Sequence, residues 1–176
     1  MALTGWAASA AGLGPASSAL CRPEQKVMFH CSLGAKSVSL CAGMQGERII
    51  NLDYRYGARL SVELVHEAGR AQSFKATQSQ LTPSARVRQV WFDRGSYTYV
   101  VSQCIGGGCP YSAGLAVLKG EKVVSSRRCQ RTADDRASFS QELASFGLDA
   151  ASSASRTELL VFDDIDLGVD RLYPTR

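Results

Sequence analysis

Apolar and polar residues alternate with a period of two along most of this chain, and this alternation constrains the fold more than any other feature. Residues 49–56, for example, read Ile-Ile-Asn-Leu-Asp-Tyr-Arg-Tyr. Successive side chains of a β-strand point to opposite faces, so each such run predicts a strand with one buried face. Units in which a strand is followed by a helix do not recur, which argues against a parallel nucleotide-binding sheet.

The alternating runs predict a mainly β protein with about eight strands, arranged as an antiparallel meander that forms a sandwich or a barrel. Glycine in the Asp93-Arg94-Gly95 turn suits a backbone that needs a positive φ angle. Residues 68–86 are polar and contain Pro83, so we expect a long connection there. The four expected hairpins pair 26–31 with 36–41, 49–56 with 60–64, 87–92 with 97–101, and 113–118 with 121–125.

Three regions differ in composition. Residues 1–19 are rich in Ala, Gly and Ser and carry no charged side chain, which resembles a secretory leader without its basic start. Residues 20–130 hold the cysteines and the strand pattern and form the predicted β-domain. Residues 131–176 form a predicted appendage with a short amphipathic helix over 136–148 and a ninth strand at 159–162.

Six cysteines follow the leader, and an even number behind an export-like segment favours disulfides and a periplasmic or secreted location. Six cysteines allow fifteen pairings. The most economical scheme joins neighbours in the predicted hairpins and then the two ends of the β-domain. It pairs Cys31 with Cys41, Cys104 with Cys109, and Cys21 with Cys129.

The stretch Cys104-Ile105-Gly106-Gly107-Gly108-Cys109 admits several kinds of chemistry. A zinc site would need a second close pair of ligands, and a redox pair would normally have two intervening residues at a helix start. A phosphate-binding loop would lead into a helix, whereas a strand pattern follows here. We therefore expect a disulfide-closed loop with no metal and no cofactor.

Catalytic residues are few. Only His30 and His66 titrate near neutral pH, and no Gly-x-Ser-x-Gly motif occurs. We expect His66 to be a surface residue at a strand end. The acidic groups Asp134-Asp135 and Phe162-Asp-Asp-Ile-Asp-Leu-Gly-Val-Asp170 lie in the appendage, and the second only partly follows the spacing of a calcium loop. The sequence therefore predicts a protein that is not an enzyme.

The net charge of +4 arises from basic residues scattered among acidic ones, which predicts no nucleic-acid site. No stretch is apolar enough to span a membrane. Tyrosines recur at period two at Tyr54 and Tyr56 and again at Tyr97 and Tyr99, which is typical of a packed core face. If one row lies outside, it would suit a protein partner. The candidate partner-binding residues are Tyr54, Arg55, Tyr56, Arg59, Ile105, Gly107 and Tyr111.

Several short patterns between residues 21 and 129 resemble a loosely defined group of exported bacterial proteins of unknown function. They are Phe29-x-Cys31, Lys36-x-Val38-Ser39-Leu40-Cys41, Tyr54-Arg55-Tyr56-Gly57 and Gly95-x-Tyr97-x-Tyr99. The resemblance implies a small disulfide-containing β-domain in the periplasm. It brings no activity or catalytic residues with it.

These observations favour a non-catalytic periplasmic binding protein that inhibits a toxin or a cell-wall-degrading enzyme, in the manner of an inhibitor or immunity protein. An alternative is an envelope protein that binds a carbohydrate, a lipid or an ion, or that has a structural role. An internal cavity would favour the alternative, and a filled core with a protruding loop would favour the inhibitor. A hydrolase that uses His66 or the aspartates of the appendage has the least support.

Overall fold

A computed structural model describes residues 19–68, 74–107, 109, 112–130, 139 and 143, and these contain nine β-strands. The strands are β1 (Lys26–Ser32), β2 (Ser37–Gln45), β3 (Arg48–Ala58), β4 (Ser61–Ala68), β5 (Lys75–Thr82), β6 (Ala85–Arg94), β7 (Tyr97–Gly106), β8 (Ala113–Lys119) and β9 (Lys122–Arg128).

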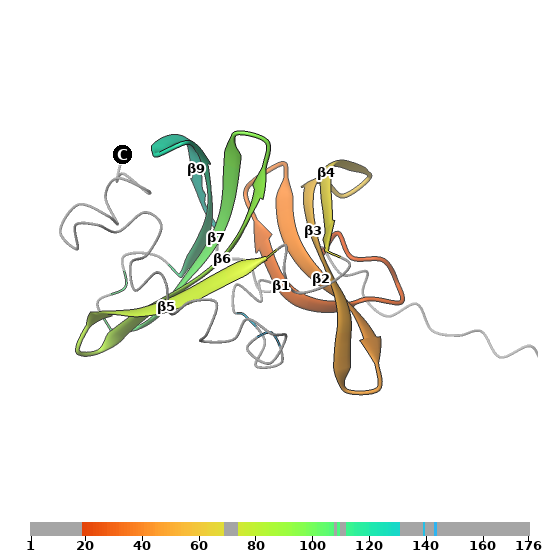
Figure 1. Cartoon of the computed structure of the whole chain (residues 1–176), viewed down its shortest axis with the longest axis horizontal. Helices are drawn as coiled ribbons and strands as arrows, with labels where there is room; N and C mark the ends of the chain where they lie inside the picture. The colour runs from red at the N-terminus through yellow and green to blue at the C-terminus, as the bar shows by residue number, and fades with distance from the viewer. Residues whose placement is uncertain are drawn as a thin grey trace, which may run out of the picture.

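The strands form two antiparallel sheets, each a simple meander in chain order (Figure 1). The first sheet has the order β1-β2-β3-β4 and the second the order β5-β6-β7-β8-β9. Among the nine described strands, the chain passes from one sheet to the other between β4 and β5. The predicted antiparallel meander is therefore confirmed, and the two packed sheets form a sandwich-like arrangement.

Strand β5 corrects the expectation of a long connection over residues 68–86. It pairs with β6 in a register that aligns Ala76 with Val90 and Gln78 with Arg88 and shifts between Gln80 and Thr82. Because β5 lies at the edge of the second sheet, it can remain polar, and Gln78 and Gln80 are exposed. Pro83 lies in the turn after the strand, where it removes no ladder hydrogen bond.

Large apolar side chains fill the space between the sheets. Phe29, Leu40 and Tyr54 of the first sheet and Phe92 and Val101 of the second belong to one buried cluster. The second sheet also buries a smaller cluster on its other face, which includes Val87, Trp91, Val100, Ala116 and Leu118.

All six cysteines form disulfides, but two of the three expected pairings are wrong. The bonds join Cys21 to Cys41, Cys31 to Cys129, and Cys104 to Cys109 as predicted. Cys31 lies opposite Val38, and Cys41 is an odd number of residues farther along β2. Cys31 therefore faces the core, whereas Cys41 faces outward, and the two cannot bond.

Residues 1–18, which contain almost all of the predicted leader, and the strand predicted at 159–162 lie outside the described residues. Of the helix predicted at 136–148, the structure describes Phe139 and Leu143 alone, and both side chains are buried in the main core cluster. The centres of the Phe139 and Phe29 rings lie 5.0 Å apart, and the backbone N–H of Phe139 donates to Gln103 Oε1. These two residues of the appendage thus pack on the β-domain.

Candidate functional site

The candidate site is the tip formed by the β5–β6 turn and the loop that the Cys104–Cys109 disulfide closes. Strand β7 ends beside this turn because Gly106 pairs with Ala85 and Ile105 with Arg86. The bond between the two cysteines closes a ring with a sequence separation of 5 residues. The backbone N–H of Cys104 donates to the carbonyl of Ser112, which fixes the exit of the loop.

Ser84 braces the loop against the β5–β6 turn. Its hydroxyl donates to the carbonyl of Gly107 over 2.9 Å, and its own N–H donates to Thr82 Oγ1. Gly106 has a φ of 111°, and a Cβ there would lie 1.9 Å from the Ser84 carbonyl oxygen. Only glycine allows this close approach of the two backbones. The tip is therefore held by a disulfide, a hydrogen bond and a glycine that cannot be replaced without strain.

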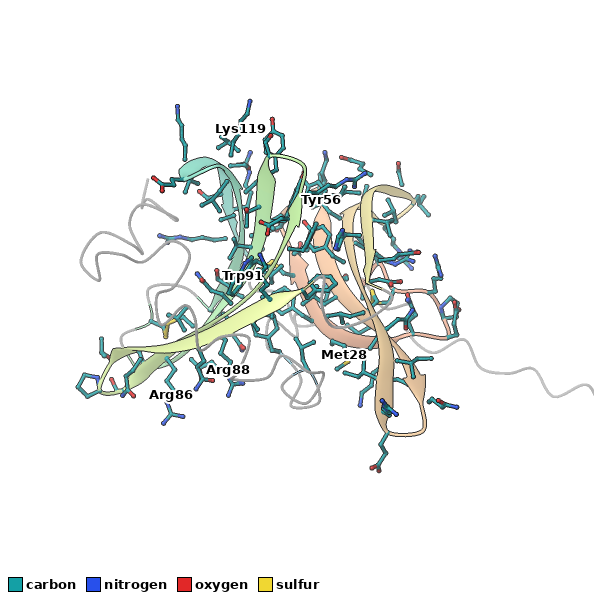
Figure 2. The ribbon with its side chains drawn as sticks, viewed as in Figure 1. Met28, Tyr56, Arg86, Arg88, Trp91 and Lys119 are labelled. Carbon is teal, nitrogen blue, oxygen red and sulfur yellow. A yellow bond between two sulfur atoms is a disulfide. The ribbon has the colours of Figure 1, made fainter. Side chains whose placement is uncertain are left out.

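The outer surface of the tip is small, apolar and weakly basic. Ile105 is 40% exposed, and Gly106 and Gly107 are exposed beside it. Arg86 is exposed on the neighbouring strand (Figure 2). The described residues of the tip include no histidine or carboxylate, so they supply neither an acid nor a base for catalysis. Such a surface suits contact with another molecule.

The second predicted contact region, Tyr54 to Arg59, is only partly on the surface. Tyr54 is 1% exposed, and its ring packs 4.9 Å from Phe92. Burial raises the pKa of Tyr54 well above its usual range. The core interpretation of this tyrosine is therefore confirmed, and its place among the partner-binding residues is wrong. Tyr56 is half-buried below Lys36, and only Arg59 is fully on the surface.

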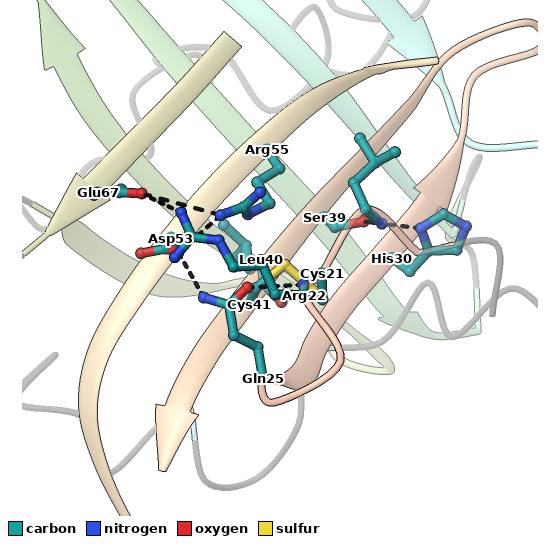
Figure 3. The surroundings of a disulfide bond; sticks show 11 residues. Cys21, Arg22, Gln25, His30, Ser39, Leu40, Cys41, Asp53, Arg55 and Glu67 are labelled. Atoms are coloured by element: carbon teal, nitrogen blue, oxygen red, sulfur yellow. Dashed lines mark hydrogen bonds and ion pairs between the residues drawn. A yellow bond between two sulfur atoms is a disulfide. The ribbon is translucent and has the colours of Figure 1, made fainter. Parts of the chain in front are cut away.

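Arg55 is also buried, on the opposite face of the first sheet (Figure 3). Its Nη2 lies 3.4 Å from Asp53 Oδ2 and 4.0 Å from Glu67 Oε1. Gln25 donates to the same Asp53 oxygen, and Arg22 reaches Glu67 over 2.9 Å. The N-terminal segment that carries Cys21 therefore covers this ion-pair network. Arg55 has a structural role here and cannot contact a partner unless the segment moves.

The structure separates the two predicted contact regions. Strand β3 ends at Ala58 at one end of the sandwich, and β7 ends at Gly106 at the other (Figure 1). Arg59 and Ile105 therefore cannot belong to one contact surface. Tyr111 lies outside the described residues.

His30 forms a buried pair with Ser39. The His30 Nδ1 lies 3.0 Å from Ser39 Oγ, and the backbone N–H of Leu20 donates to the same oxygen. His30 is 2% exposed and Ser39 is 0% exposed, so a substrate cannot reach them. The pair holds the N-terminal segment on the first sheet.

His66 is not the surface residue that the sequence predicts. Its ring stacks on Phe92 with centroids 4.0 Å apart and meets the edge of Phe74 at 5.3 Å. Burial, and then the positive charge of Arg94, lower the pKa of His66. The ring is a half-buried part of the aromatic core, and no described nucleophile bonds to it.

Metal ligands do not gather in the described part of the chain. No group of three or more His, Cys, Asp or Glu side chains there could hold a metal ion. The acidic stretch at 162–170 lies outside the described residues, as does the Asp134-Asp135 pair. Nor do the described residues include a helix that is long and apolar enough to cross a membrane.

The description of the basic residues as scattered among acidic ones misses the basic character of the second sheet. Between Glu67 and Glu121 the sequence has one acidic residue, Asp93, against six basic ones. The basic residues are Arg70, Lys75, Arg86, Arg88, Arg94 and Lys119. Counting charges over this interval would have found the asymmetry.

Comparison with known proteins identifies no relative of this chain. No family model matches the chain, and no curated protein or solved structure matches it significantly. The resemblance to exported bacterial proteins therefore stays a prediction.

Proposed function

We propose that this protein is a non-catalytic binding protein of the periplasm or the secreted fraction, and that it inhibits a toxin or a cell-wall-degrading enzyme. The braced tip at Cys104–Cys109 carries the proposal. Its backbone is fixed before contact, so little conformational entropy is lost when a partner binds. An exposed isoleucine at such a tip can fill a small apolar pocket beside a catalytic cleft.

Other features agree with this function. Three disulfides are typical of proteins from an oxidising compartment. The space between the sheets holds large side chains such as Phe29, Tyr54 and Phe92, which is the arrangement expected of an inhibitor with a filled core.

The test is capture followed by inhibition. Tagged protein is incubated with periplasmic and secreted fractions, and each captured hydrolase or toxin is assayed with and without it. We expect stoichiometric inhibition that Ile105→Asp weakens by at least about 30-fold, since truncating a central contact costs about 2 kcal/mol or more.

Ile50→Asp is the matched control, because Ile50 is 51% exposed on β3 and lies outside the tip. It should leave inhibition unchanged. Failure to retain any protein, or equal effects of the two substitutions, would contradict the proposal.

A further inference from the structure

The end of the sandwich opposite the tip collects four hairpin turns. Ser37 pairs with Gly57, so the β1–β2 and β3–β4 turns lie at the same end of the first sheet. Tyr97 pairs with Lys119, so the β6–β7 and β8–β9 turns lie at the same end of the second sheet. All four turns are at the upper end of Figure 1. We call this surface the turn end.

A row of basic and aromatic side chains crosses the second sheet at the turn end. Arg94 pairs with Tyr97, Tyr97 with Lys119, and Lys119 with Lys122. The Lys119 ammonium lies 5.7 Å from the centre of the Tyr97 ring. The N–H of Gly120 donates to the carbonyl of Ser96, which joins the two turns. Three cations and one tyrosine thus lie on one joined pair of turns.

The first sheet adds charge and an apolar side chain to the same end. Leu60 is 98% exposed in the β3–β4 turn, next to exposed Arg59. Lys36 lies 5.4 Å from the centre of the Tyr56 ring, and Figure 2 shows Tyr56 and Lys119 at the same end of the molecule. Tyr97, at 38% exposed, and Val62, at 39% exposed, also reach solvent.

Acidic side chains at the turn end are mostly neutralised. Glu63 pairs with Lys36 over 2.7 Å, and Asp93 pairs with Lys75 over 2.8 Å. Glu121 is the remaining exposed acid in these four turns. Among the described residues, no salt bridge involves the other basic side chains of the surface, which are Arg59, Arg94, Lys119 and Lys122.

We propose that the turn end binds the surface of an anionic lipid bilayer. Its cations are spread over turns from both sheets, which matches a broad negative surface better than a single anionic group in a pocket. Leu60 and Tyr97 reach solvent at the turns, and tyrosine prefers the headgroup region of a membrane. An acidic protein would match the charge, but Leu60 and Tyr97 come from different sheets, and side chains spread in this way suit the broad surface of a membrane better than one apolar pocket.

The test measures binding of the full chain to vesicles of phosphatidylcholine with and without phosphatidylglycerol. We expect binding only to the anionic vesicles, and weaker binding as salt is added. Each cation near the surface contributes about fivefold to the partition coefficient, so Lys119→Gln with Lys122→Gln should lower it about 25-fold. Leu60→Trp should add tryptophan emission that shifts to the blue on anionic vesicles.

Arg48→Gln with Arg127→Gln is the matched control, because it removes the same charge from exposed residues away from the turn end. It should leave binding almost unchanged. Equal losses in both double variants would overturn the proposal, as would no binding of the unmodified chain. Displacement from vesicles by an acidic protein at equal charge concentration, with no blue shift of Leu60→Trp, would assign the surface to a protein instead.

Discussion

The two sheets differ in how they use charge. The first sheet and the segment before it, residues 19–68, carry six basic and five acidic side chains, and the network of Asp53, Arg55 and Glu67 lies on its outer face. Residues 74–130, which form the second sheet, carry eight basic side chains and two acidic ones. Charge in the first sheet holds its own N-terminal segment in place, whereas charge in the second sheet remains at the surface. We infer that the first sheet anchors the N-terminal segment, whereas the second sheet carries the tip that we propose contacts a protein partner.

One disulfide holds the N-terminal segment on the first sheet, one closes the tip of the second, and one joins the two sheets; their removal should give the largest effects. In the chain-entropy model, losing Cys31–Cys129, with a separation of 98 residues, lowers the free energy of unfolding by about 4.7 kcal/mol. The same model gives about 3.3 kcal/mol for Cys21–Cys41, with a separation of 20, and about 2 kcal/mol for Cys104–Cys109. Denaturant unfolding of paired Cys→Ser variants checks this order. A larger loss for the Cys104–Cys109 pair than for Cys31–Cys129 would contradict it.

Arg55→Ala tests the anchoring role of the first sheet. It leaves the Asp53 carboxylate buried without its cation, so we expect a loss of about 3 kcal/mol in unfolding free energy. Arg59→Ala removes the same charge from an exposed turn and should change stability by less than about 0.5 kcal/mol. Thermal unfolding of the two variants side by side gives the comparison. Similar melting temperatures would mean that the network does not hold the first sheet.

Substitutions of two adjacent glycines test whether the tip of the second sheet is braced. Gly106→Ala would force a Cβ against the Ser84 carbonyl at a φ of 111°, and we expect a loss of about 2 kcal/mol. Gly107→Ala meets its nearest atom, Ser84 Oγ, at 3.5 Å and should be tolerated. Equal stability of the two variants by denaturant unfolding would show that the turn and the loop are not braced together.

His66 gives the smallest effect, at the boundary between the sheets. Because burial lowers its pKa in the folded protein, the unfolded chain takes up a proton first as the pH falls. Its contribution to stability is therefore complete above the unfolded pKa of about 6.5 and is lost as the pH falls through the folded pKa. His66→Phe keeps the stack on Phe92 and should flatten this part of the stability profile. An unchanged profile in denaturant titrations at several pH values would exclude His66 as the cause.

The sequence predicts most of the strands, but it does not predict every strand or every disulfide. The alternation of apolar and polar residues identified eight of the nine strands, because successive side chains of a strand point to opposite faces and this pattern is visible in the sequence alone. It missed β5 because an edge strand need not be apolar. The pairing of Cys31 with Cys129 depends on which face each strand buries after the sheets pack, and no spacing encodes that.

In the candidate site, too, the sequence predicts local features but not contacts between distant residues. Cys104–Cys109 was predictable because the two cysteines have a sequence separation of only 5, and the three glycines between them let the chain close on itself. The hydrogen bond from Ser84 that braces this loop was not predictable, because the sequence did not predict strand β5 and the turn that follows it. Tyr54, which the pattern places more readily in a core, and Arg55 are both candidate partner-binding residues by sequence, yet adjacent positions on a strand point to opposite faces and here both faces are covered.

Amide hydrogen exchange of the free protein and of its complex with a captured partner tests the division between the sheets most directly. If the tip contacts the partner, residues 82–86 and 104–107 gain protection in the complex, with little change at residues 26–68. New protection confined to the first sheet, with the tip exchanging as in the free protein, would contradict it.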